Sequence, residues 1–227
     1  MLSAQDRQTE NAAQALDHAV EWPPSGIWSV APIGGVEALK ALKIRTYDKT
    51  GTEMFAKIAA TATVVSFADL NAKLEAADIN AVLSSGDGGA GRQFWKFLRN
   101  FSDIGYAVPL SFASISLEPW ANLDDAGRAA ILDVARETTE RQWVALAVRL
   151  SENFARMRAN GVVIDEKPPA EVMDTLRAAA DASVGDWLAR AGPEARQVFE
   201  QYREKRIRWT PTASPSEMLL DLVHRTH

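Results

Sequence analysis

The chain of 227 residues contains no cysteine and only three histidines. The lack of cysteine excludes disulfide bonds and thiolate metal sites. None of the histidines, His18, His224 and His227, lies near a serine nucleophile in the sequence, and none forms a metal-ligand spacing with acidic residues. The sequence therefore carries no catalytic signature, and we expect a binding protein without a cofactor and without enzyme activity.

Long hydrophobic runs and clusters of basic residues are also missing. No stretch reaches the length of a transmembrane span, and residues 1–20 are polar and acidic, unlike a signal peptide. The net charge of -5 is spread along the chain without a basic stripe, which argues against nucleic acid as a partner. We expect a protein that is not embedded in a membrane, has no signal peptide in this chain, and buries a sizeable core.

Strands alternate with short helices in the first half of the sequence. Apolar and β-branched runs predict strands, and apolar residues at helical spacing predict helices. This alternation is typical of an α/β fold with a mainly parallel sheet flanked by helices. The predicted strands are residues 27–30, 43–46, 62–66, 79–83 and 106–117, and the predicted helices are residues 9–20, 36–42, 52–60, 67–76 and 91–99.

The second half of the sequence is predicted to be mostly helical. Residues 124–160 contain no proline and keep apolar residues at helical spacing until Gly161. This pattern predicts one helix long enough to span more than one packed unit. The elements expected after it are a brief strand at residues 162–164, helices at 169–191 and 193–208, and a short amphipathic helix that ends at His224.

Arg45 is the sharpest candidate for a ligand-binding residue. It lies near the end of a short predicted strand, and α/β sheets bind ligands in the crevice outside the carboxyl ends of their strands. Its guanidinium matches a carboxylate in two parallel hydrogen bonds. The alternative role for Arg45 is a structural salt bridge.

A second candidate segment follows the predicted strand at residues 79–83. Ser84 and Ser85 could offer hydroxyl and backbone N–H groups to an anion, and six residues rich in glycine come after them. This run lacks the endings of a phosphate-binding P-loop and of a dinucleotide-binding turn, so we expect residues 88–91 to form a flexible turn between a strand and a helix. Among the nearby aromatic residues, Phe67 is expected to line the crevice, and Trp22 borders the same region.

The order of these segments resembles the solute-binding subunits of tripartite ATP-independent periplasmic (TRAP) transporters, the DctP-like family. No single motif is decisive, but the ordered series covers roughly residues 20–205. The segments that carry the resemblance are WPPSGIWS at residues 22–29, LKALKIRTYDKTGT at 39–52, SFADL at 66–70, LEAADINA at 74–81, the stretch 84–95, YAVPL at 106–110, the long helix and NGV at 160–162.

The resemblance implies a periplasmic-binding-protein-like two-lobe fold that closes on a small organic anion, with a long hinge-spanning helix. It implies a periplasmic location and TRAP membrane permease subunits as partners. Arg45 takes the place of the family's carboxylate-binding arginine, Phe67 that of an aromatic residue lining the pocket, and Ser84 that of an asparagine that contacts the ligand in many members. Ser25 lies where some members have a second arginine, which favours a ligand with one charged group.

The sequence also departs from the family pattern. The first half of the first lobe has no counterpart, so we expect an incomplete first lobe. Family glycines and an aspartate are replaced by Ala41, Ala59, Ala77 and Asn80, and a usual proline by Ala62. The expected division is a remnant of the first lobe with the crossover at 1–27, the second α/β lobe at 28–112, a return strand with the long hinge helix and C-terminal helices at 113–210, and a tail at 211–227.

Three functional interpretations are consistent with these residues. The preferred one is a TRAP solute-binding protein that captures a small carboxylate. The alternative is a cytosolic sensor or interaction module derived from the same fold, which the lack of a signal peptide favours. An enzyme acting on hydroxy or keto acids comes third, because no catalytic grouping accompanies Arg45 and Ser84.

Overall fold

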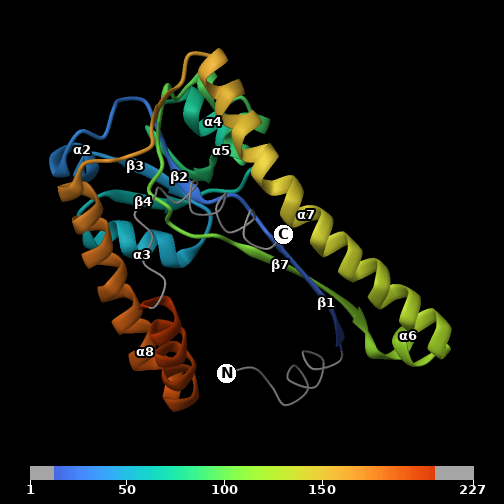
Figure 1. The fold of residues 1–227 in the computed structure, drawn as a ribbon. Coiled ribbons are helices and arrows are strands. Elements are labelled where there is room, and N and C mark those ends of the chain that lie inside the picture. Colours follow the sequence, from blue (N-terminus) through green and yellow to red (C-terminus); the bar gives the residue numbers. More distant parts are fainter. Residues whose placement is uncertain (1–12, 208–227) are drawn as a thin grey trace.

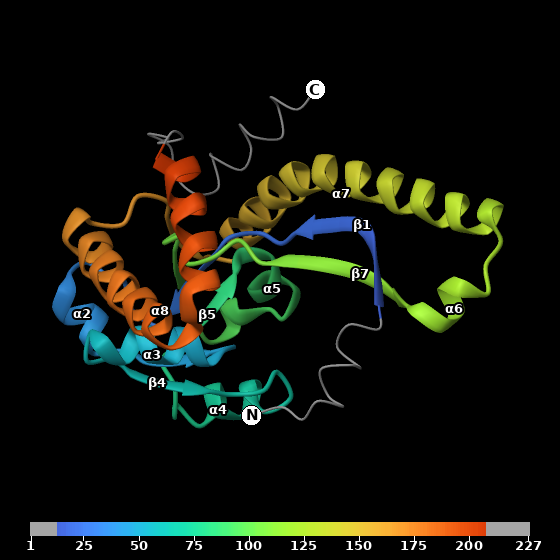
Figure 2. The same ribbon diagram turned by 90° about the horizontal axis from the view of Figure 1, so that it is seen from below.

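A computed structural model of the protein describes residues 13–207, which form a six-stranded sheet and a separate two-stranded sheet (Figure 1). The larger sheet has helices on both faces, and the smaller one belongs to an arm that extends away from it (Figures 1 and 2). The predicted α/β fold is confirmed. The tail prediction for residues 211–227 lies outside the described residues.

The six-stranded sheet has the strand order β4-β3-β5-β2-β6-β8. Strand β2 is antiparallel to both of its neighbours, β5 and β6, whereas the other pairs are parallel. The sheet is therefore mainly parallel, as predicted, with one reversed strand near its centre. The strands are β2 (Ser25–Ser29), β3 (Lys43–Thr46), β4 (Thr61–Val64), β5 (Ala81–Ser85), β6 (Asn100–Ser102) and β8 (Val163–Asp165).

Two hydrophobic clusters fill the space on either side of this sheet. Alternate residues of a strand point to opposite faces, so Ile27 and Leu83 join one cluster while Trp28 and Val82 join the other. The first cluster packs under α2 (Val36–Lys40), α3 (Lys49–Lys57) and α8 (Ala170–Ile207). The second packs under α4 (Leu70–Glu75), α5 (Gly86–Gly91), the 3-10 helix η1 (Phe94–Lys96) and the end of α7 (Asp125–Ala159).

The arm consists of β1 (Ala13–Glu21), β7 (Leu110–Ser116), α6 (Leu117–Ala121) and the first part of α7 (Figure 1). Strands β1 and β7 pair antiparallel, from Ala13 opposite Ser116 to Glu21 opposite Leu110. Helix α7 runs from the arm to the larger sheet, where Phe154 and Met157 enter the second cluster. The single long helix predicted at residues 124–160 is confirmed, and it links the two sheets.

Helix α8 confirms the predicted pair of helices at residues 169–191 and 193–208 as far as residue 207. The break between the two parts lies at Gly192, which has a φ of 79°, followed by Pro193. Glycine adopts this left-handed conformation without a steric penalty, and the proline ring cannot continue a preceding helix. The turn between the two parts therefore follows directly from the sequence.

Three local predictions are wrong, and the helix predicted at residues 67–76 begins only at Leu70. Residues 13–20 of the predicted helix at 9–20 are strand β1, because pairing with β7 outweighs a weak helical pattern; residues 9–12 lie outside the described part. Residues 88–91 belong to helix α5 rather than to a flexible turn, since the Ser85 hydroxyl caps the helix by accepting the N–H of Gly88 at 3.0 Å. The helix predicted at 91–99 shrinks to η1, because Gln93 has a φ of 56°.

Helix α5 also depends on the absence of a side chain at Gly89. A Cβ atom there would lie 2.2 Å from Cε2 of Trp28. The Trp28 ring is fully buried, and its Nε1 donates a hydrogen bond to the carbonyl oxygen of Ser85 at 3.1 Å. Gly89 is thus required for α5 to pack closely against β2.

Candidate functional site

Four of the predicted site residues lie at one edge of the six-stranded sheet. Arg45 is the third residue of β3, and Ser84 and Ser85 end β5. Strand β2 starts at this edge with Ser25, which is opposite Ser85 in the antiparallel register. Because β3, β4 and β5 are parallel, their carboxyl ends meet here, as expected for a ligand-binding edge of an α/β sheet.

The guanidinium of Arg45 is held by backbone carbonyl groups. Its Nε donates to the carbonyl oxygen of Val65 at 2.9 Å and its Nη1 to that of Leu83 at 3.5 Å. Arg45 is only 3% exposed, yet it forms no ion pair with any residue in the described range 13–207. The alternative of a structural salt bridge is therefore not realised among these residues.

Burial lowers the pKa of Arg45, and the neighbouring charge of Arg92 lowers it further. An arginine remains protonated at neutral pH despite such shifts. The site thus contains a positive charge whose solvation by water is largely lost and whose orientation is fixed by two neutral acceptors. An arrangement of this kind can bind an anion, because a carboxylate would supply the missing counter-charge.

Phe67 lies beside Arg45, but in a loop rather than at the start of a helix. Helix α4 begins only at Leu70, because the hydroxyl of Ser66 accepts the N–H of Asp69 and forms a turn. Phe67 is 42% exposed, and Cζ of Arg45 lies 4.6 Å from the centroid of its ring. The ring is therefore available as an apolar surface next to the guanidinium.

The three serines of the predicted site differ in their surroundings. Ser84 and Ser25 are buried, and the hydroxyl of Ser25 lies 3.3 Å from that of Tyr47. The Ser85 hydroxyl caps α5, so it is committed to local structure. Ser25 is paired with Ser85 and Gly26 with Ser84, so the side chains of Ser25 and Ser84 point to opposite faces of the sheet.

Trp22 is not brought into this group by its described contacts. Its indole Nε1 donates to the hydroxyl of Ser111 at 2.7 Å, and its backbone N–H to the carbonyl oxygen of Pro109 at 2.8 Å. Ser111 belongs to β7, so Trp22 lies where the arm joins the larger sheet. Its ring is 49% exposed.

One tyrosine and one arginine at this edge, Tyr47 and Arg92, were missed by the sequence reasoning. Tyr47 and Tyr106 pack edge to face with centroids 6.2 Å apart, and burial raises the pKa of both phenols. Arg92, just after α5, lies with Cζ 4.2 Å from the Phe67 centroid. Tyr47 could have been found by its place two residues after Arg45. Arg92 lies where the sequence predicts the start of a helix, and nothing in the local sequence indicates that it reaches the site.

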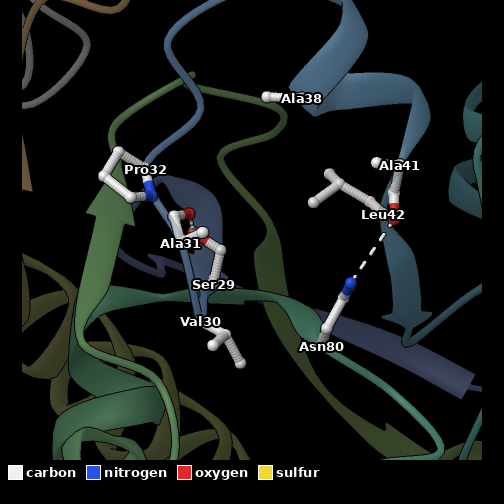
Figure 3. Close-up of a pocket in the computed structure, with 8 residues that line it drawn as sticks. All are labelled: Ser29, Val30, Ala31, Pro32, Ala38, Ala41, Leu42 and Asn80. Atoms are coloured by element: carbon white, nitrogen blue, oxygen red, sulfur yellow. Dashed lines mark hydrogen bonds between the residues drawn. The ribbon is translucent and has the colours of Figure 1, made fainter.

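A cavity of about 220 Å³ lies at the other end of the central strands, where β2 ends and β3 and β5 begin. Figure 3 shows its walls, which come from the end of β2 and from the residues that precede β3 and β5. The Asn80 amide at its rim is already engaged, since it accepts the N–H of Lys43 at 2.7 Å and donates to the carbonyl oxygen of Ala41 at 3.4 Å. The lining is mostly apolar and consists of Ser29, Val30, Ala31, Pro32, Ala38, Ala41, Leu42 and Asn80.

Two further features, a metal site and a membrane-spanning helix, are absent from the described part of the chain. No group of His, Asp or Glu side chains among residues 13–207 could hold a metal ion. None of the helices within that range combines the length and the apolar character needed to cross a membrane.

Comparison with solved structures shows which proteins share this fold. DctP7 of Bordetella pertussis, an extracytoplasmic solute receptor binding pyroglutamic acid, is 25% identical, with a TM-score of 0.78 over 87% of this chain and 65% of that chain. A marine metagenome TRAP solute-binding protein specific for pyroglutamate is 21% identical, with a TM-score of 0.76 over 88% and 67%. A TRAP periplasmic solute-binding protein of Desulfovibrio desulfuricans with bound sn-glycerol-3-phosphate is 16% identical, with a TM-score of 0.80 over 93% and 69%.

The family comparison leads to the same group of proteins. No curated protein matches the sequence. The chain spans 65% of the length of DctP7, so it corresponds to a part of such a receptor. The DctP profile, described as bacterial extracellular solute-binding protein, family 7, matches residues 26–187. The chain therefore belongs to the DctP family of bacterial extracellular solute-binding proteins, the family of TRAP solute receptors.

Proposed function

We propose that this chain is the ligand-binding part of a TRAP solute receptor that captures a small organic carboxylate through Arg45 and delivers it to membrane permease subunits. One observation carries the proposal: a buried guanidinium at the carboxyl ends of parallel strands has two carbonyl partners and no carboxylate among the described residues. The carbonyl groups orient the guanidinium without neutralising it. An ionised ligand group would complete its coordination.

Pyroglutamate is the first ligand to test. DctP7, at 25% identity, binds pyroglutamic acid, which is a small ring bearing one carboxylate. Its carboxylate would pair with Arg45, and its ring would pack on the exposed part of Phe67, whose ring adjoins the guanidinium. Galactonate, galacturonate, orotic acid and sn-glycerol-3-phosphate occupy other proteins of this fold and complete the set of probes.

The ligand is expected to bind less tightly to this chain than to a receptor of full length. A small ligand is usually buried almost completely by its site, and this chain spans 65% of the length of DctP7. The larger sheet supplies one wall through Arg45, Phe67 and Ser84. The proposed location is the periplasm, because a TRAP receptor collects its solute there before delivery.

A thermal-shift titration tests the proposal on the chain as it stands. At a ligand concentration of about 100 times Kd, binding adds about 2.7 kcal/mol to the free energy of unfolding. We expect at least one of the probes to raise the Tm of the unmodified chain, and Arg45→Gln to abolish that increase. An equal increase in Arg45→Gln, or none with any probe in the unmodified chain, would contradict the proposal.

A further inference from the structure

Arg92 reaches from the end of α5 to the same aromatic ring as Arg45. Its Nη1 donates to the backbone carbonyl oxygen of Phe67 at 3.2 Å, and its Cζ lies 4.2 Å from the centroid of the Phe67 ring. Cζ of Arg45 lies 4.6 Å from that centroid. Two guanidinium groups from different elements, β3 and the residue after α5, therefore share one half-exposed ring.

The two positive charges are not balanced by the protein in the part that the structure describes. Neither Arg45 nor Arg92 forms an ion pair with a described residue. Asp48 is the nearby acid, but its Oδ1 accepts the N–H of Gly51 at 2.5 Å as the N-cap of α3. Burial and then the charge of Arg92 are the two largest causes that lower the pKa of Arg45, so the two guanidinium groups are close enough to repel each other.

Arg128 is an arginine that contacts an aromatic ring and also has an acidic partner. Arg128 donates through Nε to the carbonyl oxygen of Trp120 at 3.2 Å and lies with Cζ 5.9 Å from that ring, in the same type of contact as Arg92 with Phe67. Arg128 has a counter-charge in Asp125, with an Nη1–Oδ1 distance of 3.5 Å. An arginine can therefore stack on an aromatic ring and form an ion pair at the same time. Neither Arg45 nor Arg92 has such an acidic partner among the described residues.

On the basis of the carboxylate site proposed above, we propose that Arg92 is a second cation of that site and gives it a preference for ligands with two anionic groups. Arg45 binds the first carboxylate at the sheet edge. Arg92 attracts the second group, a carboxylate or a phosphate, across the Phe67 ring.

Succinate and butyrate form the matched pair of probes, because they have the same number of carbons and differ in whether the far end is a carboxylate or a methyl group. In calorimetric or NMR titrations, we expect the unmodified chain to bind succinate about 10-fold more tightly than butyrate or better. Arg92→Gln should remove this preference and leave the butyrate affinity within about 3-fold. Arg92→Lys, which keeps the charge, should retain most of the preference.

The controls separate this inference from the proposed function. Arg128→Gln removes an equivalent ring contact on the arm and should change neither affinity. Arg45→Gln should weaken both ligands; if it does not, the carboxylate site itself is misassigned. An equal loss of both ligands in Arg92→Gln would mean that Arg92 only holds Phe67 in place. That result, or no preference for succinate in the unmodified chain, including no binding of either probe, would overturn the inference.

Discussion

At the residue scale, the site depends on side chains whose positions follow from strand geometry and on others that do not. The position of Arg45 at a ligand-binding edge could be predicted, because a short strand and its carboxyl end are visible in the local sequence. The carbonyl oxygens of Val65 and Leu83 that hold it could not be predicted, since they come from neighbouring strands. Arg92 was missed for the same reason: its partner, Phe67, is 25 residues away.

A stability prediction concerns the Cβ atom that a side chain at Gly89 would add. Gly89→Ala would place a Cβ 2.2 Å from the Trp28 ring, and overpacking of a core costs about 1–3 kcal/mol of stability. We expect a loss of that size in urea unfolding. Gly91→Ala is the matched control in the same helix, because a Cβ there meets nothing within 4 Å; it should be neutral or slightly stabilising. Equal effects of the two changes would show that the close approach of α5 to Trp28 is not realised.

At the element scale, helices and strands with local signals were predicted well, and those that depend on distant partners were not. Helix α7 and the break in α8 follow from apolar spacing and from Gly192-Pro193. Strand β1 needs β7, whose paired residues lie 89 to 103 positions further along the chain, and helix α5 needs its Ser85 cap and the ring of Trp28. These contacts outweigh the intrinsic preference of the short segments.

The ends of α3 and α4 give a prediction at this scale. Ala59 and Ala77 follow the C-caps of these helices with φ values of 63° and 54°. The next residues close the turns, Ala60 N–H to the Phe55 carbonyl oxygen and Asp78 N–H to that of Lys73, in the pattern that favours glycine at the left-handed position.

We expect Ala59→Gly and Ala77→Gly each to stabilise the protein by about 0.5–1 kcal/mol, because glycine avoids the cost of the left-handed conformation. Thermal or urea unfolding measures the effect. Ala76→Gly is the control, since Ala76 has a φ of -75°, and it should be destabilising. A loss of stability in all three variants would argue against left-handed backbone at residues 59 and 77.

At the scale of the whole molecule, two sheets of unequal size are joined by α7 (Figure 2). The arm exposes apolar side chains on β7 and α7: Leu110, Phe112, Val134, Val144 and Val148. A two-stranded ribbon is marginally stable by itself in water. The sequence indicated an incomplete first lobe through its resemblance to the family, but periodicity gave no sign of the β1–β7 pairing.

Hydrogen exchange tests this difference between the two sheets. Amides of β1 and β7 should exchange much faster than those of β3 and β5, because the side chains of β7 are mostly exposed while the larger sheet is packed on both faces. Exchange followed by mass spectrometry resolves these segments. Protection of the ribbon equal to that of the central strands would show that the arm is part of one cooperative unit with the lobe.

The guanidinium of Arg45 has no acidic partner in the described part of the chain, and we propose that this leaves it free to bind a carboxylate from solution. Isothermal titration of pyroglutamate into the unmodified chain, Arg45→Gln and Arg128→Gln tests it most directly. We expect equal binding to the unmodified chain and Arg128→Gln, and a loss of about 2–5 kcal/mol of binding free energy in Arg45→Gln. Pyroglutamate binding that survives in a folded Arg45→Gln protein would contradict it.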